Sequence, residues 1–535
     1  MDVHEVVEET LAKLGKTDGV WISTFSAAQL HARADEIDPS LPLAGLTFGV
    51  KDNIDVAGLP TTAACPGFGY SPERTAPVVQ RLLDAGAIAV GKTNLDQFAT
   101  GLTGARSPYG TPQSVFGGGL ISGGSSSGSA VAVADGTVGF ALGTDTAGSG
   151  RVPAALNGIV GLKPTRGLLS TLGVVPACRS LDCVSIFAPD LGTAGRVMRT
   201  ASGHVAGDPW SRTGQRPLIL DPRVAVPASL DFFGDAGQEK AFARFGGDLK
   251  VDIGPLLEAG DLLYRGPWVA ERLADLGEFL EAHPDAVLPI TRDILRTGYG
   301  FSAADAFRAQ HRLQELKLAA DEIWQTADVL VLPTIGTTYT HAEIAADPIG
   351  RNLDLGRYTQ FANLLNMAAV TVPHGFTHDG RPASLTLFGP AFSDETLRHH
   401  ARSLTGGDVM TIAVVGLHLS GQPRNGELLE RGATLIGAAR TAPSYRLYVL
   451  PSGAPGLVRV AAGGAAIDVE LWQLPASGVG GFLTGIKAPL GLGRVAMQDG
   501  TEVTGFLCEE YAVAGALDIT ASGGWRNHRM GGANS

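Results

Sequence analysis

Residues 120–166 read LISGGSSSGSAVAVADGTVGFALGTDTAGSGRVPAALNGIVGLKPTR. Two clusters rich in glycine and serine, GGSSSGS at 123–129 and TAGSG at 146–150, flank a segment of small residues that can pack a helix against a strand. Glycines let the backbone approach a ligand closely, and such clusters turn several N–H groups towards one point. A flexible glycine–serine linker is the alternative interpretation. The apolar, periodic segments AVAVA and VGFAL argue against it, because a solvated linker would not carry them.

The hydrophobic pattern of the chain predicts helices and short apolar strands in alternation. The helices are expected at 3–15, 26–36, 261–283 and 301–325, and the strands within 41–58, at 138–145 and at 329–336. Residues 77–99 predict a helix, a strand and a second helix that begins near Thr93 or Asn94, and residues 362–375 predict a helix followed by a strand. Ser302 and Asp305 are spaced to form a capping box. The alternation predicts an α/β sheet.

The composition changes near residues 404–408. Beyond this point, strand-like segments are separated by short glycine turns. The change predicts two domains: a large α/β domain of residues 1–405, and a smaller α+β domain of residues 408–535 that is mostly β with some helix.

Composition excludes several classes of function. The 535 residues carry a net charge of −12 and no basic stripe, which disfavours binding to nucleic acid or to an anionic membrane. The N-terminus lacks the features of a signal peptide, and no apolar run approaches the roughly 18 residues of a membrane span. Four scattered cysteines favour a reducing cytoplasm. Cys178 and Cys183 lack two further ligands in register, so we interpret them as buried apolar residues and expect no metal site.

Ser149 is the candidate nucleophile of the second cluster. It lies where a strand gives way to an expected helix with Pro153 in its first turn, and the unpaired N–H groups of a helix start suit a developing oxyanion. A serine hydroxyl needs a neighbouring base to remove its proton. The chain holds no histidine between His31 and His204, so a base from this segment cannot be a histidine. A later histidine such as His374 stays an alternative if the fold brings it close.

Lys51 is the other candidate base. It follows the apolar residues Phe48, Gly49 and Val50, and a lysine at the end of a buried strand is unfavourable unless it is paired or functional. A surface lysine paired with Asp52 or Asp55 is the equal alternative. To act as a base near neutral pH, the Lys51 pKa would have to fall from about 10.4 towards 7, and burial can supply much of that shift.

The motifs GGSSSGSA and GTDTAGSGRVPA, with VKDNI upstream, closely resemble those of the amidase signature family of serine hydrolases. That family uses a Ser–cis-Ser–Lys triad whose serines are 24 positions apart, as Ser125 and Ser149 are here. The resemblance covers roughly residues 40–400 and implies a mixed central sheet covered by helices. It implies Ser149 as the nucleophile, Ser125 as the proton relay after a cis bond from Gly124, and Lys51 as the base, with no cofactor.

The resemblance also implies an oxyanion hole and a braced loop. The hole would be formed by the backbone N–H groups of Thr146, Ala147 and Gly148, together with that of Ser149. Asp145 and Arg151 are expected to brace the loop rather than to touch the substrate. Two features depart from the family pattern: Ala147 replaces a common glycine, and residues 114–124 carry glycines where relatives have an Asn-Pro-like or Asp-Pro-like turn.

A finer resemblance is to the allophanate hydrolase subgroup. YRGPWVAER at 264–272 and GFLCEEYAVAGALDITASGGWR at 505–526 are similar to segments of these enzymes, and the second lies in a domain that most amidases lack. In the subgroup, a tyrosine and an arginine eight positions apart hold the substrate, as Tyr264 and Arg272 would here, together with Gly124. An arginine can clamp a carboxylate bidentately. The alternatives are a salt bridge of Arg272 with Glu271 or Asp275 and a core position for Tyr264.

The implied reaction is hydrolysis of the terminal amide of allophanate through an acyl-enzyme on Ser149, releasing ammonia and, after decarboxylation, carbon dioxide. The resemblance implies a small-molecule substrate, a homodimer and urea carboxylase as a pathway partner. A broad-specificity amidase, the amidase subunit of a tRNA-dependent amidotransferase and a catalytically inactive assembly protein stay as alternatives. In the C-terminal domain, which relatives connect with decarboxylation or assembly, His418 and Glu509 are the polar residues that we would test.

Overall fold

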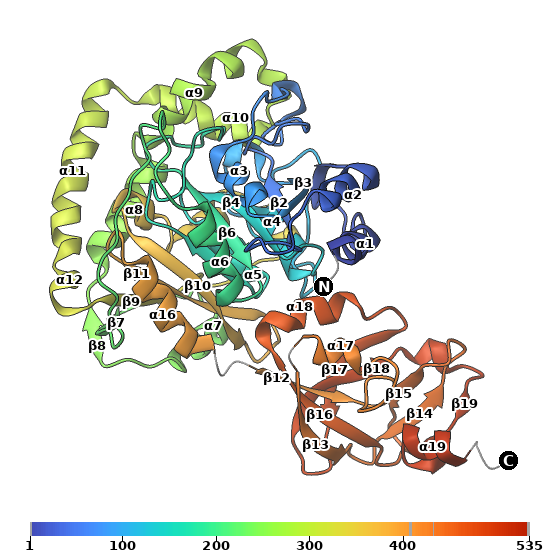
Figure 1. Ribbon diagram of the computed structural model, residues 1–535. Helices are drawn as coiled ribbons and strands as arrows, with labels where there is room; N and C mark the ends of the chain where they lie inside the picture. Colours follow the sequence, from blue (N-terminus) through green and yellow to red (C-terminus); the bar gives the residue numbers. More distant parts are fainter. Residues whose placement is uncertain (1–2, 406–408, 432, 532–535) are drawn as a thin grey trace. The chain divides into compact units, whose positions relative to one another are not determined.

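The computed structural model describes residues 3–405, 409–431 and 433–531, and the chain divides into two compact units, Met1–Gly406 and Gly407–Ser535. The first unit is built on one sheet of eleven strands (Figure 1). In sheet order these are β1 (Trp21–Thr24), β3 (Ile88–Thr93), β2 (Thr47–Lys51), β4 (Phe140–Asp145), β6 (Cys183–Ala188), β5 (Val160–Lys163), β10 (Ala368–Phe376), β11 (Pro382–Gly389), β9 (Val329–Pro333), β7 (Val224–Pro227) and β8 (Leu249–Val251). Parallel and antiparallel pairs both occur, so the predicted mixed α/β sheet is confirmed.

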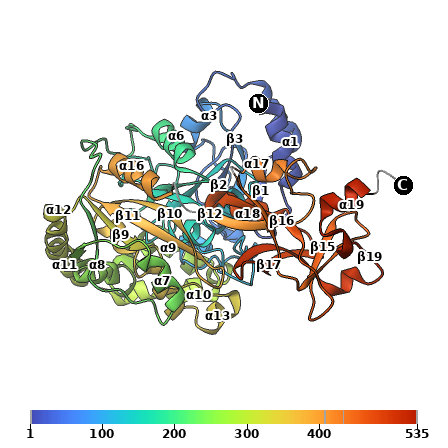
Figure 2. The ribbon, with the colours of Figure 1, turned by 90° about the horizontal axis from the view of Figure 1, so that it is seen from below.

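Helices cover both faces of this sheet, because alternate side chains of each strand point to opposite faces. In β9, Val329 and Val331 pack into one core cluster, and Leu330 and Leu332 pack into another. The first cluster includes α3 (Pro77–Asp84), α6 (Leu191–Ala201) and α16 (Asp394–Thr405). The opposite face carries α4 (Ser127–Ala134), α5 (Val152–Leu156), α8 (Gly254–Arg265), α11 (Ala303–Asp321) and α15 (Phe361–Leu364). Figure 2 shows α6 and α16 on one side of β9–β11, with α8 and α11 on the other.

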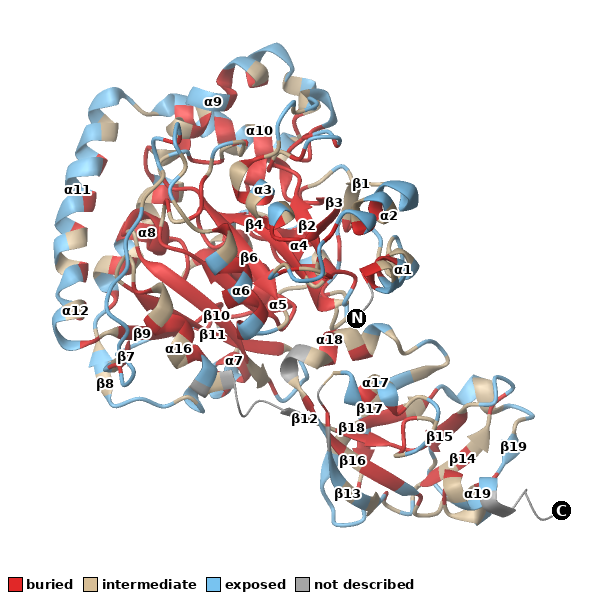
Figure 3. Ribbon diagram, viewed as in Figure 1, coloured by how far each residue is buried: buried red, intermediate tan, exposed pale blue. Residues whose placement is uncertain are grey.

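The strands of the sheet form most of the buried core, as Figure 3 shows. The remaining helices lie around it: α1 (Val3–Lys13), α2 (Ala27–Asp35), α7 (Ala236–Ala243), α9 (Trp268–Ala282), α10 (Pro289–Arg296), α12 (Ile323–Thr326), α13 (His341–Ala346) and α14 (Gly350–Gly356). Among the described helices, none combines the length and the apolar character that crossing a membrane would need.

Most of the predicted elements are present, and two are wrong. The segment 261–283 is not one helix, because Gly266 and Pro267 separate α8 from α9. After β3, only a single 3-10 turn forms (Gln97–Ala99), since Phe98 adopts a left-handed φ of 52° that an α-helix cannot contain. The capping box of Ser302 and Asp305 at the start of α11 is confirmed.

The loop that departs from the family pattern requires its glycines. Gly117, Gly118 and Gly119 have φ values of 71°, 64° and 72°, a region that is unfavourable for residues with a Cβ. The turn closes with a hydrogen bond of 3.1 Å from the N–H of Leu120 to the carbonyl of Gly117. Three consecutive glycines therefore replace the proline-type turn.

The second unit is mostly β, as predicted. A five-stranded sheet has the order β13 (Thr434–Arg440), β16 (Asp468–Pro475), β12 (Val409–Val414), β18 (Glu502–Cys508) and β17 (Leu490–Ala496). A smaller sheet has the order β15 (Pro455–Arg459), β14 (Tyr445–Val449) and β19 (Leu517–Asp518). Its described helices are short: α17 (Gly426–Leu429), α18 (Ala476–Thr484) and α19 (Trp525–Gly531).

Candidate active site

The candidate catalytic residues gather where β2 and β4 end. These two strands are parallel neighbours, so their carboxyl ends lie at the same edge of the sheet, where α/β proteins commonly bind ligands. Lys51 is the last residue of β2, and Thr144 and Asp145 end β4. Ser125 lies just before α4, which packs against both strands. Residues that are distant in sequence therefore meet at one point.

Lys51 is fully buried and contacts Ser125. Its Nζ donates hydrogen bonds to Oγ of Ser125 at 2.8 Å and to Oγ1 of Thr144 at 2.8 Å. Burial lowers the pKa of Lys51 to about 7, although the carboxylates of Asp96 and Asp145 act to raise it. A substantial fraction of the amine is therefore uncharged at neutral pH, as a general base requires.

The alternative of a surface lysine is wrong. Asp52, one of the two expected partners, forms a buried ion pair with Lys92 at 3.1 Å. Asp55, the other, accepts a hydrogen bond from the hydroxyl of Tyr70 at 2.8 Å. Both carboxylates are engaged elsewhere, so the only polar contacts of the Lys51 amine in the described residues are the two hydroxyl groups.

The peptide bond between Gly124 and Ser125 is cis, as expected. Gly124 donates its N–H to the carbonyl of Leu102 at 2.8 Å, and a Cβ at Gly124 would lie 2.1 Å from Oδ2 of Asp96. Only glycine fits at this position. The Ser122 hydroxyl donates to the carbonyl of Gly123 at 3.2 Å, and no described residue donates to the carbonyl of Gly124, so this oxygen is available to a ligand.

Ser149 lies in the loop between β4 and α5 and is 4% exposed. Within the described residues its hydroxyl has no hydrogen-bond partner, and no direct bond joins it to Ser125. No histidine bonds to Lys51, Ser125 or Ser149 in this part of the chain, and the ring of His374 packs against Phe245 instead. The structure therefore pairs Lys51 with Ser125 and leaves the Ser149 hydroxyl free.

Asp145 and Arg151 brace this loop, as expected. Both are fully buried, and Arg151 donates from Nε to Oδ2 at 2.9 Å and from Nη2 to Oδ1 at 2.8 Å. The same carboxylate accepts the N–H groups of Gly148 at 3.0 Å and Gly150 at 2.9 Å. Burial alone would raise the pKa of Asp145, but the charge and hydrogen bonds of Arg151 outweigh it and lower the pKa. Ser149 is thus held between two residues that are anchored to one carboxylate.

The expected oxyanion hole needs one correction. The N–H of Gly148 points at Asp145, so it is not free to bind a substrate oxygen. The N–H groups of Thr146, Ala147 and Ser149 have no acceptor in the described residues. Thr146 is further fixed by a hydrogen bond from its hydroxyl to Asp182. Three N–H groups of this loop, including that of Ser149 itself, therefore remain available as donors.

Tyr264 and Arg272 come from two different helices. Tyr264 lies at the end of α8 and Arg272 in the first turns of α9, so the break between these helices sets their relative position. Arg272 is 5% exposed, and its Nη1 donates to Oγ1 of Thr100 at 2.7 Å. Burial raises the pKa of Tyr264, while the nearby positive charges of Arg272 and Arg106 oppose the shift.

Arg272 does not form the alternative salt bridges. Glu271 accepts both the N–H and the hydroxyl of Ser180 at 2.7 Å, and Asp275 pairs with Arg179. Among the described residues, no carboxylate lies within ion-pair distance of Arg272. A buried guanidinium group without an anion is unfavourable on its own, and it is suited to a negatively charged ligand.

Arg272 is connected to the catalytic loop region. It bonds to Thr100, and the carbonyl of Leu102, two positions further on, accepts the N–H of Gly124. Asp182 accepts a hydrogen bond from the hydroxyl of Thr146. Burial raises the pKa of Asp182 to about 6, and the positive charge of Arg272 acts against this shift. The guanidinium group therefore lies near the residues that flank both serines.

Four residues of the site were missed by the sequence analysis: Thr100, Arg106, Thr144 and Asp182. Thr144 could have been identified from the sequence, because it lies at the end of the strand parallel to β2 and within the GTDTAGSG motif. Arg106 is 5% exposed and lies far before Arg272 in the chain, so no local pattern connects the two.

The other candidates are the cysteines and two residues of the second unit. All four cysteines are free and buried, and burial is what the sequence predicts for Cys178 and Cys183. His418 is buried, its ring contacts Phe482 and Phe506, and its Nε2 is 3.2 Å from Glu427. Glu509 is exposed and has no side-chain contact with His418. Within the described residues, no three His, Cys, Asp or Glu side chains form a group that could hold a metal ion.

Two family models match this chain. The amidase model matches residues 5–226 and 258–397, and the allophanate hydrolase C-terminal domain model matches residues 410–530. Among curated proteins, the urea amidolyases of Lachancea kluyveri and Saccharomyces cerevisiae are 40% and 39% identical over 96% and 95% of the chain. The chain spans only 31% of the length of each of these two relatives. A glutamyl-tRNA(Gln) amidotransferase chain of Natronomonas pharaonis is 34% identical over 66% of this chain and 94% of its own length.

The chain is also similar to solved structures of an allophanate hydrolase and a urea amidolyase. The selenomethionine-substituted allophanate hydrolase of Kluyveromyces lactis is 38% identical, with a TM-score of 0.72 over 99% of this chain and 96% of its own. The urea amidolyase of the same organism is 37% identical, with a TM-score of 0.72 over 100% of this chain and 36% of its own. The likeness to both proteins extends over both units of the fold.

Proposed function

Because the chain belongs to the amidase family and carries an allophanate hydrolase C-terminal domain, we propose that it hydrolyses the terminal amide of allophanate. The observation that carries the choice of substrate is Arg272, a buried guanidinium group that has no carboxylate partner among the described residues. Allophanate is a small carboxylate with a ureido arm. Its carboxylate would satisfy Arg272, with Tyr264 beside it, and place the terminal carbonyl towards Ser149.

In the proposed mechanism, the uncharged amine of Lys51 accepts a proton from Ser125, which in turn accepts the proton of Ser149. The Ser149 oxygen attacks the terminal carbonyl carbon, and the N–H groups of Thr146, Ala147 and Ser149 stabilise the resulting oxyanion. The relay returns the proton to the leaving nitrogen, and ammonia departs. Water then cleaves the acyl-enzyme to N-carboxycarbamate, which loses carbon dioxide. The Gly124 carbonyl is free to accept a hydrogen bond from the substrate.

The direct test is steady-state ammonia release from allophanate, malonamate and acetamide by the purified chain. We expect kcat/KM to be highest for allophanate and to be lowest for acetamide, which has no carboxylate to pair with Arg272. Equal values for all three amides would indicate a broad-specificity amidase instead.

The activity is expected to rise with pH. Below pH 7 the Lys51 amine is mostly protonated and cannot accept a proton, and above its pKa of about 7 it is mostly neutral. The profile of kcat/KM against pH should therefore rise through an apparent pKa near 7 and level off on the alkaline side. A profile that is flat from about pH 6 to 9 would contradict Lys51 as the base.

Arg272→Gln should change the choice of substrate. Removing the buried cation should lower kcat/KM for allophanate by about 100-fold, because a charge-assisted bidentate contact is lost. The value for acetamide, which lacks a carboxylate, should change by less than about threefold. Arg179→Gln is the matched control: Arg179 bonds to Asp275 of helix α9 but is half exposed, and its loss should leave both values unchanged. An equal fall for both amides would contradict the proposed contact.

The remaining predictions concern partners. The urea amidolyase relatives are longer than this chain, and we propose that a urea carboxylase supplies its allophanate. A homodimer stays a prediction from family resemblance, and a cytoplasmic location stays a prediction from the few scattered cysteines. Light scattering of the purified chain would test the first of them.

A further inference from the structure

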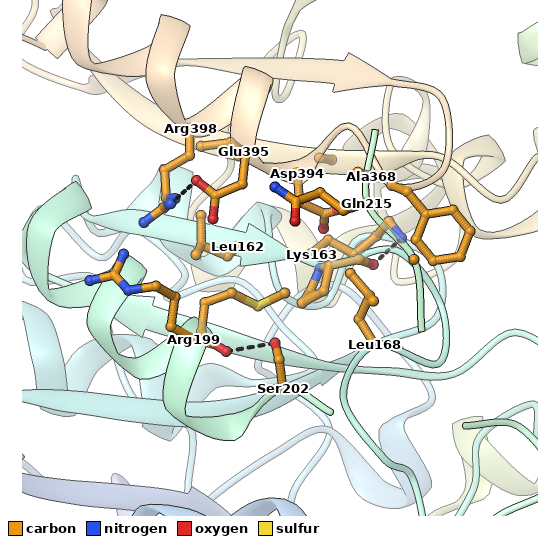
Figure 4. Close-up of a pocket in the computed structure, with 16 residues that line it drawn as sticks. Leu162, Lys163, Leu168, Arg199, Ser202, Gln215, Ala368, Asp394, Glu395 and Arg398 are labelled. Carbon is orange, nitrogen blue, oxygen red and sulfur yellow. Dashed lines mark hydrogen bonds and ion pairs between the residues drawn. The ribbon is translucent and has the colours of Figure 1, made fainter. Parts of the chain in front are cut away.

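The catalytic loop, residues 146–150, packs on one face of the large sheet. Ala147 belongs to the same core cluster as Tyr358, on the face that α8, α11 and α15 cover. A pocket of about 370 Å³ opens on the opposite face, where Leu162 and Ala368 line it (Figure 4). None of the described residues that line this pocket belongs to the loop. The contacts that position the loop therefore come from the sheet itself and from the segment around α15.

Thr359 lies in the turn between α14 and α15 and is fully buried. Its hydroxyl donates a hydrogen bond to the carbonyl of Ala147 at 2.8 Å, and no other described residue donates to that carbonyl. The carbonyl of Gly356, at the end of α14, is farther from the hydroxyl, at 3.3 Å. The contact with the loop is close, because a Cβ built on Gly148 would lie 2.2 Å from Oγ1 of Thr359. The hydroxyl group therefore holds the catalytic loop rather than its own turn.

The peptide group between Ala147 and Gly148 is held at both ends. The carbonyl of Ala147 accepts the hydrogen bond from Thr359, and the N–H of Gly148 donates to Oδ1 of Asp145 at 3.0 Å. In a planar trans peptide the carbonyl and the N–H point in opposite directions, so the two bonds together fix the rotation of the peptide plane. Gly148 has a φ of 135°, and glycine itself restricts this rotation least. The plane therefore depends on its two hydrogen bonds.

This peptide plane joins two of the proposed oxyanion donors. The N–H of Ala147 belongs to the peptide group before it, and the N–H of Ser149 belongs to the peptide group after it. Rotation about ψ of Ala147 or φ of Gly148 changes the angle between these two N–H groups. Stabilisation of an oxyanion depends on donors that are already directed at the point where the charge develops. A fixed central plane therefore keeps both donors directed at one point.

We propose that Thr359 is a positioning residue for the reaction, whose hydroxyl holds the peptide group after Ala147 and so directs the N–H groups of Ala147 and Ser149 at the oxyanion. Thr359 is fully buried and acts through the loop rather than by touching the substrate. The inference rests on the proposed function only in taking Ser149 as the nucleophile. It applies to any substrate whose carbonyl carbon Ser149 attacks.

Thr359→Val removes the hydroxyl and keeps the size of the side chain. The backbone of residue 359 stays anchored, because its carbonyl accepts a hydrogen bond from Nη1 of Arg151 at 2.8 Å. We expect kcat for ammonia release from allophanate to fall by about tenfold or more, with KM changed by less than about threefold, since the two donors act on the transition state. Thr359→Ser keeps the hydroxyl, and its kcat should lie within about threefold of that of the unchanged protein.

The rate at which a fluorophosphonate labels Ser149 gives a second readout, which does not require allophanate to be the substrate. The phosphoryl oxygen of the probe gains negative charge as the Ser149 oxygen attacks phosphorus and fluoride leaves. Labelling should therefore slow by about tenfold or more in Thr359→Val and recover in Thr359→Ser. This pattern, found together with no hydrolysis of allophanate by the unchanged chain, would refute the proposed substrate and support the positioning role of Thr359.

Thr10→Val is the matched control. Thr10 is a buried threonine of α1, and its hydroxyl lies 3.1 Å from that of Thr47, which begins β2 and so lies at the opposite end of this strand from Lys51. The variant loses one buried hydroxyl, as Thr359→Val does, but no contact with the catalytic loop. We expect its kcat and its labelling rate to stay within about threefold of those of the unchanged protein.

Thr359→Ala covers the case in which Thr359→Val does not fold. It removes the hydroxyl without placing a methyl group against the carbonyl of Ala147, and labelling of Ser149 should slow in the same way. Denaturant unfolding of each variant shows which of them are folded. An unchanged labelling rate in a folded variant that lacks the hydroxyl, a raised KM with an unchanged kcat, or no recovery in Thr359→Ser would each overturn the proposal.

Discussion

Ser149→Ala is expected to lower kcat for ammonia release from allophanate by about four orders of magnitude or more. The variant removes the oxygen that would form the acyl-enzyme, and no other described hydroxyl occupies the loop between Gly148 and Gly150, which Asp145 holds in place. The free energy of unfolding should be nearly unchanged, because the Ser149 hydroxyl makes no hydrogen bond within the described residues. Initial rates with a coupled ammonia assay and denaturant unfolding would measure the two effects.

Ser129→Ala is the matched control for this variant. Ser129 is a buried serine of α4, and its hydroxyl bonds to the carbonyl of Leu142 at 2.9 Å rather than to Lys51. We expect a loss of about 1 kcal/mol in stability and an activity close to that of the unchanged protein. A fluorophosphonate should label the unchanged chain and the Ser129→Ala variant, but not Ser149→Ala. Full ammonia release by Ser149→Ala would refute the assigned nucleophile.

Lys51→Met should cause a similarly large loss of kcat, about 10³-fold or more, because the proton relay acts as a unit. The thioether cannot accept the proton from Ser125, although methionine has nearly the same length as lysine. Stability should change by no more than about 2 kcal/mol, since the loss of two hydrogen bonds is partly offset by removing a buried amine. The activity of Lys51→Met should not recover at high pH. A variant that only raised the pKa of the catalytic base would regain activity there.

For Lys92→Met we expect the opposite of Lys51→Met: a large loss of stability with the activity retained. Lys92 is also a buried strand lysine, but it pairs with Asp52 at 3.1 Å, and its removal leaves a buried carboxylate without its cation. We expect about 3 kcal/mol or more of lost stability, with kcat per folded molecule retained. If Lys92→Met lost activity and Lys51→Met lost only stability, the roles of the two lysines would be reversed.

Much of the fold could be predicted from periodicity. Strands buried on both faces, such as VLVLP at 329–333, are continuous apolar runs, and amphipathic helices repeat every three to four residues. The predicted helices were wrong where the backbone conformation of one or two residues ends or prevents a helix. Glycine and proline at 266–267 ended a helix that the apolar pattern alone would continue, and Phe98 in a left-handed conformation prevented another.

The candidate site was predicted in part. The spacing of Ser125 and Ser149 pointed to the site through the resemblance to the amidase signature family, and the position of Lys51 after an apolar strand suggested a functional lysine. The orientation of the Gly148 N–H towards Asp145, which removes it from the oxyanion hole, had no such signal. Backbone N–H groups are present at every residue except proline, so their direction depends on φ and ψ and not on the side chain.

The sequence by itself determined the α/β class, the second mostly β unit and the motifs that hold the two serines and Lys51, because periodicity and local motifs are properties of neighbouring residues. Only the tertiary structure decided which charges meet. It paired Lys92 with Asp52 and so left Lys51 to the hydroxyl groups, and it engaged Glu271 and Asp275 elsewhere and so left Arg272 without an anion. The pKa of a buried group depends on desolvation and on charges brought from distant parts of the chain, and these exist only after the strands and helices have packed together.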